Sequence, residues 1–295
     1  MKNGFLKLLI RNNYHLFSKT DRKLADYFLK LNDTLINKTI ANLSNETGIS
    51  QTTVFNFVKK LGFEGFQEFK ITLATNIASE EENKSDSAIN IYSDVTGKDS
   101  PSEVADKIIT FNKNSLDTLQ ETLDRDKLAN VIDLILNLET LHFYGQGGSS
   151  VVAYDSFHKF MRSKYNCNYI IDYHLQLGYS AKLTNKDAVF LFSHSGYSKE
   201  TINLAKQIRK TDAVLITLTG NPGSELVKYS DESLIVISEE SKFRSESLNS
   251  RILYLTVMDV INTTLMYKDE VNNQSSFDKM RDALAVTRVD KDFIS

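Results

Sequence analysis

The stretch TIANLSNETGISQTTVFNFVKKL, residues 39–61, indicates how the first part of this chain folds. Thr39 is a candidate N-cap for a helix over residues 40–47, and Gly48 supplies the left-handed residue with which helices often end. Ser50 is a second N-cap candidate, and the apolar residues after it recur at helical spacing. Two helices joined by a tight glycine turn are typical of a helix-turn-helix motif.

The second of these helices, expected over residues 51–61, has one apolar and one polar face. Its apolar stripe consists of Val54, Phe57, Val58 and Leu61. Hydroxyl and amide side chains at the start of such a helix reach base edges or phosphates in the major groove. The side chains that we expect to contact DNA are Ser50, Gln51, Thr52, Thr53, Asn56, Lys59 and Lys60. A helical bundle used for dimerisation would have a similar pattern, so this alternative stays open.

A further helix and a positive charge accompany the motif. Ser18 and Asp21 have the spacing of a capping box, and Leu24 and Phe28 follow at helical spacing. Residues 1–78 carry 11 Lys and Arg against 6 Asp and Glu, a net charge of +5, whereas the remainder carries −8 and the whole chain −3. A basic module joined to an acidic one favours nucleic-acid binding at the basic end.

Residues 5–78 resemble the N-terminal domain of RpiR-type bacterial transcription regulators. The resemblance is carried by FSKTDRKLADYFLKLND, TIANLSNETG and, most specifically, GISQTTVFNFVKKLGFEGFQEFK. It implies a DNA-binding helix-turn-helix domain. The family usually has Arg where this chain has Asn56. Asparagine still pairs with adenine through two hydrogen bonds, so we expect a changed operator sequence or affinity rather than a loss of DNA binding.

Length and composition indicate a globular chain of two domains. The 295 residues suggest two units at roughly 100–200 residues per domain, and 41% of the residues are hydrophobic. The polar segment 79–103 is an expected linker between a first domain, 1–78, and a second, 104–267, with a tail at 268–295.

The same composition bears on compartment and cofactors. No apolar run approaches the roughly 20 residues of a membrane span. The N-terminal stretch FLKLLI contains Lys7 and no cleavage site follows it, so we expect no signal peptide. A single cysteine, Cys167, excludes a disulfide framework and argues against a zinc site. We therefore expect a cytoplasmic protein without a metal.

From about residue 104 short apolar segments alternate with amphipathic helices. Helices are expected over 102–123, 126–138 and 199–210, and strands over 141–144, 169–171, 188–192, 213–218 and 233–237. This alternation predicts a parallel sheet with helices on both faces, so the fold class is an all-α domain followed by an α/β domain. Ligands of such sheets bind at the carboxyl ends of the strands.

Two loops at such strand ends are suited to an anion. Residues 145–150, GQGGSS, combine glycines with a helix start, where backbone N–H groups approach a phosphate. Residues 193–198, SHSGYS, place three hydroxyls on one turn before a helix. Two alternatives stay open. The first loop and Asp172 could belong to an NAD site, although Ser150 takes the last glycine position, and Ser198 could be a simple N-cap.

Residues 105–267 resemble the SIS (sugar isomerase) domain, a phosphosugar-binding fold. The first loop resembles its glycine loop, SHSGYS its S-x-S-G-x-[ST] phosphate loop, and residues 244–251 the segment that closes the site. The resemblance implies that the following residues bind a sugar phosphate: Gly147, Ser149, Ser193, His194, Ser195, Gly196, Ser198 and Ser250. The two domains together are the RpiR architecture. They imply a regulator of carbohydrate or amino-sugar genes that binds double-stranded operator DNA as a homodimer or homotetramer through its SIS domain.

SIS domains also occur in aldose–ketose isomerases, so a sugar-phosphate isomerase is the alternative function. Isomerisation needs a positioned base, for which His194, His174 and Glu246 are candidates. They form no recognisable catalytic pair, and an isomerase would leave the helix-turn-helix motif unexplained. We expect no catalytic residues and no cofactor.

Overall fold

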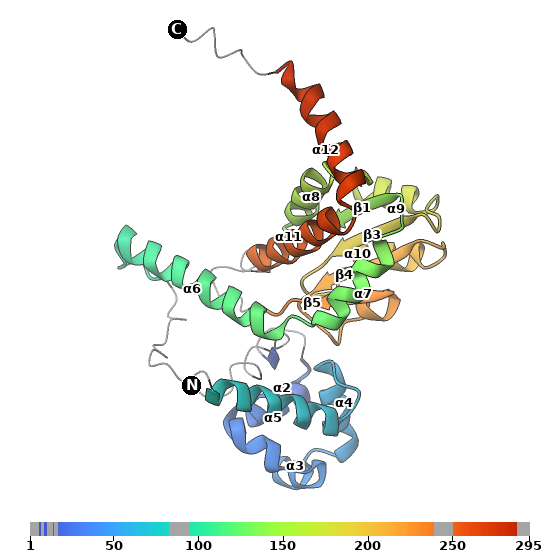
Figure 1. Ribbon diagram of the computed structural model, residues 1–295. Coiled ribbons are helices and arrows are strands. Elements are labelled where there is room, and N and C mark those ends of the chain that lie inside the picture. Colours follow the sequence, from blue (N-terminus) through green and yellow to red (C-terminus); the bar gives the residue numbers. More distant parts are fainter. Residues whose placement is uncertain are drawn as a thin grey trace.

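The computed structural model describes residues 17–82, 95–238 and 250–287, together with Leu6, Leu9, Ile10 and Tyr14. Within these residues the N-terminal part is helical, and the C-terminal part is a parallel sheet covered by helices (Figure 1). The predicted fold class is therefore confirmed.

Capping side chains define the helices of the N-terminal domain. These helices are α2 (Lys19–Leu31), η2 (Asn32–Asn37), α3 (Ile40–Thr47), α4 (Gln51–Lys60) and α5 (Phe66–Glu82). Thr39 forms a capping box with Asn42 at the start of α3, and Gly48 ends that helix with φ 69°. The Ser50 side chain accepts a hydrogen bond from the Thr53 N–H at the start of α4. The predicted turn and both helix starts are confirmed.

Aromatic rings fill the core of this domain. Phe57 of α4 lies edge-on to Phe17, with 5.2 Å between ring centroids, and edge-on to Phe28, at 5.3 Å. Phe28 also stacks on Phe69 of α5 at 5.8 Å. Phe57, Phe28 and Phe69 are at most 1% exposed, so this ring cluster fixes α4 against its neighbours.

The C-terminal domain contains a five-stranded parallel sheet. Its strands are β1 (Thr140–Gly145), β2 (Asn166–Tyr169), β3 (Asp187–Phe192), β4 (Val214–Thr219) and β5 (Glu232–Ile235), in the order β2-β1-β3-β4-β5. Four of the predicted strands overlap these closely. The strand predicted over 169–171 is misplaced, because the edge strand has the polar sequence NCNY whereas the apolar Ile171 after it is 73% exposed.

Helices cover both faces of the sheet. The α-helices described in this domain are α6 (Pro101–Thr122), α7 (Arg125–Ile135), α8 (Ser149–Phe160), α9 (Tyr173–Ser180), α10 (Lys199–Ile208), α11 (Ser250–Lys268) and α12 (Glu270–Ala285). One face packs against α7, α8, α11 and the end of α6, and the other against α9 and α10. Side chains alternate along the strands, so that Phe143 faces the first group and Tyr144 the second.

The segment expected to be a linker is bounded by helices. Helix α5 continues to Glu82, and α6 begins at Pro101 with a capping box between Ser100 and Glu103. Both ends of the expected linker, 79–103, therefore belong to helices. Residues 83–94, which include the apolar Ile89, Ile91 and Tyr92, lie outside the described residues.

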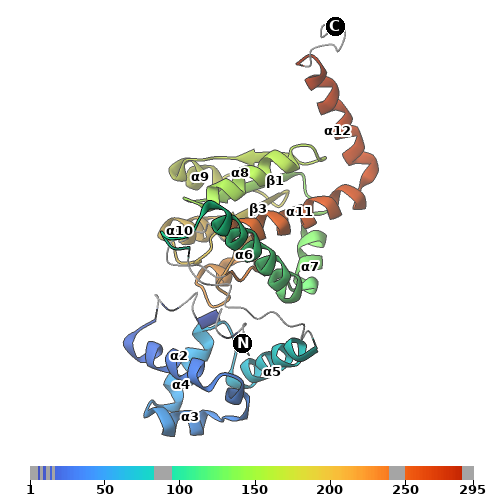
Figure 2. The same ribbon diagram turned by 90° about the vertical axis from the view of Figure 1, so that its left-hand side faces the viewer.

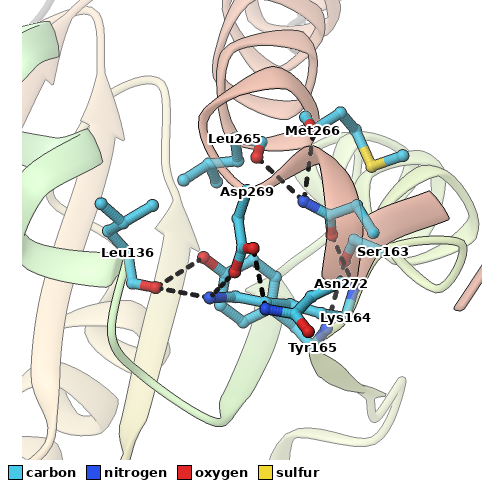
Figure 3. A network of polar contacts seen from close by, with 9 residues as sticks. Leu136, Ser163, Lys164, Tyr165, Leu265, Met266, Asp269 and Asn272 are labelled. Atoms are coloured by element: carbon cyan, nitrogen blue, oxygen red, sulfur yellow. Dashed lines mark hydrogen bonds and ion pairs between the residues drawn. The ribbon is translucent and has the colours of Figure 1, made fainter. Parts of the chain in front are cut away.

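The expected tail contains α12, which extends away from the sheet (Figures 1 and 2). Its start is held by polar contacts to Lys164, in the turn between α8 and β2 (Figure 3). The Lys164 ammonium donates to the Leu136 carbonyl at 2.9 Å and to Asp269 at 2.7 Å. The buried Asn273 accepts from the Lys164 N–H at 2.8 Å and donates to the Leu265 carbonyl at 3.0 Å. These contacts fix the junction of α11 and α12.

Candidate functional sites

Helix α4 presents its polar side chains to solvent. Ser50, Gln51, Thr52, Asn56, Lys59 and Lys60 are exposed, and Thr53 is half-buried. Val54, Phe57 and Val58 on the opposite side are buried. The hydroxyls of Ser50 and Thr53 lie 2.8 Å apart, so both take part in the cap. The structure thus brings the residues predicted to contact DNA to one outward-facing helix and its N-cap.

Each of the two lysines at the end of α4 contacts one neighbouring side chain. The Lys60 ammonium lies 2.7 Å from the buried carboxylate of Asp21. Burial raises the pKa of Asp21, but hydrogen bonds from Lys60 and Ser18 outweigh it and hold the pKa below the ordinary value. The Lys59 ammonium lies over the Phe55 ring, 5.4 Å from its centroid. Lys59 therefore stays available on the outer face, whereas Lys60 is engaged within the domain.

Phe55 is an exposed aromatic residue of α4 that the sequence analysis did not assign to the DNA-facing side. Its side chain is 36% exposed. Its neighbours Thr52, Asn56 and Lys59 are all on the exposed face. The sequence contained a signal for this exposure, because Phe55 falls outside the apolar stripe of the helix.

Strand register brings the candidate ligand loops together. Gly145, the last residue of β1, pairs with Phe192, the last of β3, and Phe192 pairs with Leu218 near the end of β4. The Ser193 N–H also donates to the Leu218 carbonyl at 3.1 Å. The loops that follow β1, β3 and β4 therefore leave the same edge of the sheet side by side.

The loop after β1 is tightly wound. Gly147 has φ 53°, and the Ser149 N–H donates to the Gln146 carbonyl at 3.0 Å. Ser149 is 6% exposed and begins α8, and a β-carbon on Gly145 would lie 2.6 Å from its carbonyl oxygen. Only glycine fits at 145, so the backbone of this loop stays close to the start of α8.

The loop after β3, residues 193–198, is called the phosphate loop below, after the ligand predicted for its serines. Ser193 is buried, Ser195 and Ser198 are half-buried, and Gly196 turns the chain with φ 67°. The Ser195 hydroxyl accepts from the Tyr197 N–H at 3.3 Å. Ser198 is the N-cap residue of α10 but makes no side-chain cap hydrogen bond; its hydroxyl donates to Glu200 at 2.7 Å. The simple N-cap interpretation therefore does not account for this serine.

His194 belongs to the phosphate loop and contacts α11, the helix that begins at Ser250. The His194 Nδ1 lies 3.2 Å from the Tyr254 hydroxyl of α11, and its ring covers Gly220. Ser250 lies one turn before Tyr254 on α11 and is fully buried. The structure thus links His194 of the loop to α11 and buries Ser250 at the start of that helix. Residues 244–249, the rest of the predicted closing segment, lie outside the described residues.

A third loop joins the site, and the sequence analysis missed it. Residues 219–224, TGNPGS, follow β4 and are called the β4 loop below. The Gly220 N–H donates to the His194 carbonyl at 2.9 Å, and the Asn221 amide donates to the Ser195 carbonyl at 3.4 Å. The sequence signal for this loop is its content of turn-forming residues at the carboxyl end of a predicted strand, which is where ligand sites of parallel sheets lie.

No metal-binding cluster is found among the residues that the structure describes. Across 17–82, 95–238 and 250–287, no group of three His, Cys, Asp or Glu side chains is arranged to hold a metal ion. Of the isomerase candidates, His174 is exposed on α9 and Glu246 lies outside the described residues. The same ranges contain no helix that is both long and apolar enough to cross a membrane.

Comparisons with known proteins identify two domain families in this chain. Residues 4–80 match the helix-turn-helix domain of the rpiR family, and residues 134–263 match the SIS domain. An uncharacterized HTH-type transcriptional regulator of Thermotoga maritima is 34% identical over 262 residues, which is 88% of this chain and 91% of the relative. The chain belongs to the RpiR family of transcription regulators.

Two further relatives show how far the likeness extends along the RpiR-family chain. The HTH-type transcriptional regulator HexR of Escherichia coli is 28% identical over 97% of this chain and 96% of its own length. The structure of the Vibrio vulnificus NanR protein complexed with ManNAc-6P has a TM-score of 0.62 at 24% identity, covering 96% of this chain and all of that one. Both relatives span the helix-turn-helix and SIS domains, so the likeness covers the whole architecture.

Proposed function

We propose that this regulator senses a phosphorylated sugar at its SIS domain, and that the bound sugar phosphate changes its affinity for operator DNA. One observation carries the proposal. The three serines of the phosphate loop lie at the start of α10, beside the glycine loop after β1. A helix start surrounded by hydroxyl and backbone N–H donors binds a phosphate without needing a cation. Among the described residues, Ser193, Ser195 and Ser198 are the proposed phosphate ligands.

The sugar would extend from the phosphate loop towards the loop after β1. Gly147 and Ser149 lie on that loop, and Gln146 donates to the buried Gln176 side chain. The NanR structure, whose fold this chain shares, holds ManNAc-6P, which supports a sugar phosphate as the class of ligand. The genes controlled would then belong to carbohydrate or amino-sugar use.

DNA reading would be the task of α4 in two or more copies of the chain. Two recognition helices bind half-sites one helical turn or a multiple apart, which requires a homodimer or homotetramer. In this proposal the copies of the chain contact one another through their SIS domains, and the protein acts in the cytoplasm. Bound sugar phosphate must then change the affinity for DNA by the same factor by which bound DNA changes the affinity for sugar phosphate.

The first test is thermal unfolding of the full chain with hexose, amino-sugar, N-acetylmuramate and pentose phosphates. A ligand at about 100 times its dissociation constant should stabilise the protein by about 2.7 kcal/mol. The unphosphorylated sugars should have no effect. Stabilisation without a phosphate requirement, or turnover of a stabilising ligand to its aldose or ketose partner, would contradict the proposal.

Ser195→Ala should remove most of this stabilisation and leave DNA binding without ligand unchanged. The Ser195 hydroxyl accepts a long backbone hydrogen bond from the Tyr197 N–H, at 3.3 Å, so its loss should not disturb the fold. Ser115→Ala is the matched control, because this half-buried hydroxyl lies on α6 and donates to the Phe111 carbonyl. Equal loss of ligand response in both variants would refute the assignment of the phosphate loop.

Glu200→Gln should tighten sugar-phosphate binding about threefold, because it removes a negative charge beside the proposed phosphate. The hydrogen bond from Ser198 holds the pKa of Glu200 below its ordinary value, so the carboxylate is charged at neutral pH. The amide oxygen of glutamine accepts a weaker hydrogen bond from Ser198 than the carboxylate does, so the Ser198 hydroxyl is more readily given up to the phosphate. Calorimetric titration at low and high salt checks the effect, which should shrink as salt increases. Weaker binding in this variant would show that the phosphate lies elsewhere.

A further inference from the structure

The β4 loop is packed against the phosphate loop along its whole length. Besides the two hydrogen bonds described above, the Thr219 hydroxyl donates to the His194 carbonyl at 3.2 Å, and the Tyr197 hydroxyl donates to the Gly223 carbonyl at 3.3 Å. A β-carbon on Gly196 would lie 2.3 Å from the Ser224 hydroxyl oxygen. The two loops therefore have no space in which to move independently.

Ser224 is the most closely packed residue between these loops. It is 1% exposed, and its hydroxyl has no hydrogen-bond partner within the described residues. A buried hydroxyl without a partner costs free energy, so its position reflects packing rather than bonding. Any change in the backbone at Gly196 must displace Ser224.

The other side of the β4 loop contacts the end of the recognition helix. A β-carbon on Gly62, directly after α4, would lie 2.5 Å from the Pro222 ring. A β-carbon on Gly223 would lie 2.3 Å from the carbonyl oxygen of Lys60, the last residue of α4. The backbone of Gly223 thus meets the backbone of Lys60, and the only side chain beside Gly62 in this contact is the rigid ring of Pro222, so little at this junction can absorb a displacement.

The segment at the end of β5 completes the junction between the domains. Leu234 and Val236 belong to the core of the SIS domain, whereas Ile235 and Ile237 pack against the core of the helix-turn-helix domain. The Val236 N–H donates to the Thr219 carbonyl at 2.8 Å, so this segment is bonded to the start of the β4 loop. Figures 1 and 2 both place the helical domain on the β5 side of the sheet.

We propose that the β4 loop couples the phosphate loop to the recognition helix, so that ligand in the SIS domain repositions the carboxyl end of α4. This inference rests on the proposed sensing of a sugar phosphate and names its regulatory route. Closely packed backbone transmits small shifts because it has few intermediate arrangements. The route is short: from Gly196 through Ser224 to Gly223, and from there to Lys60.

The route can be tested without any ligand. Gly196→Ala should displace Ser224 and thereby weaken the hydrogen bonds of the backbone amides at residues 61–63. In the structure the Leu61 N–H donates to the Phe57 carbonyl and the Gly62 N–H donates to the Lys59 carbonyl. Hydrogen exchange of these amides, followed by mass spectrometry, should rise about fivefold or more. Gly147→Ala is the control for backbone strain, since φ is 53° there and a β-carbon meets nothing within 4 Å. It should leave exchange at 61–63 unchanged.

Gly223→Ala tests the second half of the route and leaves the sequence of the phosphate loop unchanged. It should raise exchange at 61–63 and change the factor by which a stabilising sugar phosphate alters DNA affinity. Gly178→Ala on α9, where a β-carbon has open space, should change neither quantity. This pair also keeps the test valid if Gly196→Ala fails to fold.

The outcomes separate this inference from the proposed function. Normal exchange at 61–63 in both Gly196→Ala and Gly223→Ala would overturn the coupling route, even if a sugar phosphate stabilises the protein. Raised exchange in both variants supports the route. If no sugar phosphate stabilises the wild type, the sensing proposal fails on that result, and the exchange data still decide whether the two loops move α4.

Discussion

Replacing both Thr52 and Lys59 with alanine is expected to lower the affinity for operator DNA by about 100-fold, because one contact of a polar side chain to a base and one to a phosphate are lost at each half-site. Thr52 is exposed in the first turn of α4, and Lys59 is exposed near its end. Neither residue packs in the aromatic core of the domain, so its stability should be unchanged. A genomic fragment selected by the wild-type protein serves as the DNA, and fluorescence anisotropy gives the affinities.

Salt dependence distinguishes the two contributions. Loss of a phosphate contact by Lys59 should reduce the slope of log affinity against log salt by about 1 for each recognition helix. Thr52→Ala alone should weaken preferred sequences more than random DNA and leave the slope unchanged. The control is the double variant Lys182→Ala with Thr264→Ala, which removes one lysine and one threonine side chain from the SIS domain. It should change neither the affinity for DNA nor the salt slope. An equal loss in this control, or normal DNA binding in the α4 variant, would show that another surface reads DNA.

The helical domain could be predicted closely because its helix ends depend on local chemistry. Thr39, Gly48 and Ser50 act through neighbours within four residues, and each does in the structure what its sequence position predicts. The buried strands β3 and β4 were also found within one residue at each end, since apolar runs bounded by polar turns mark them. Local signals of this kind need no knowledge of the tertiary fold.

Other features depend on contacts that are distant in sequence. The edge strand β2 is polar and partly exposed, so it lacks the apolar pattern of a buried strand. The β4 loop becomes part of the site only because β3 and β4 pair in register. The engagement of Lys60 by Asp21, 39 residues earlier, likewise required the packed domain. Sequence alone therefore predicted the serines of the phosphate loop as ligands, but it did not predict the residues that hold the loop in place.

The apolar sequence at the end of β5 shows how the two domains constrain each other. Leu-Ile-Val-Ile, residues 234–237, has no polar alternation because its two sides meet two different cores. A strand with one solvent-exposed face would alternate. The run was predicted as one more buried strand, and the structure shows that its outer side is buried by the helix-turn-helix domain.

Phe57→Ala is expected to destabilise the helix-turn-helix domain by about 3–5 kcal/mol, because it removes a fully buried aromatic ring and leaves a cavity. Phe57 also holds α4 in place through edge-on contacts to Phe17 and Phe28. The substitution therefore removes these aromatic contacts of the recognition helix in addition to the free energy of burying the ring. Denaturation followed by circular dichroism should show an early transition of the helical domain, separate from that of the SIS domain.

Phe55→Ala, two residues earlier on the same helix, is the matched control. Its ring is 36% exposed, so the expected loss is about 0.5 kcal/mol. The contrast between the two variants tests which face of α4 is buried, and hence which face is left for DNA. If Phe57→Ala costs no more than Phe55→Ala, α4 does not pack on the aromatic core, and the polar side chains of Thr52, Asn56 and Lys59 would not be held as one DNA-reading surface. A large loss confined to Phe57→Ala supports the arrangement on which DNA recognition depends.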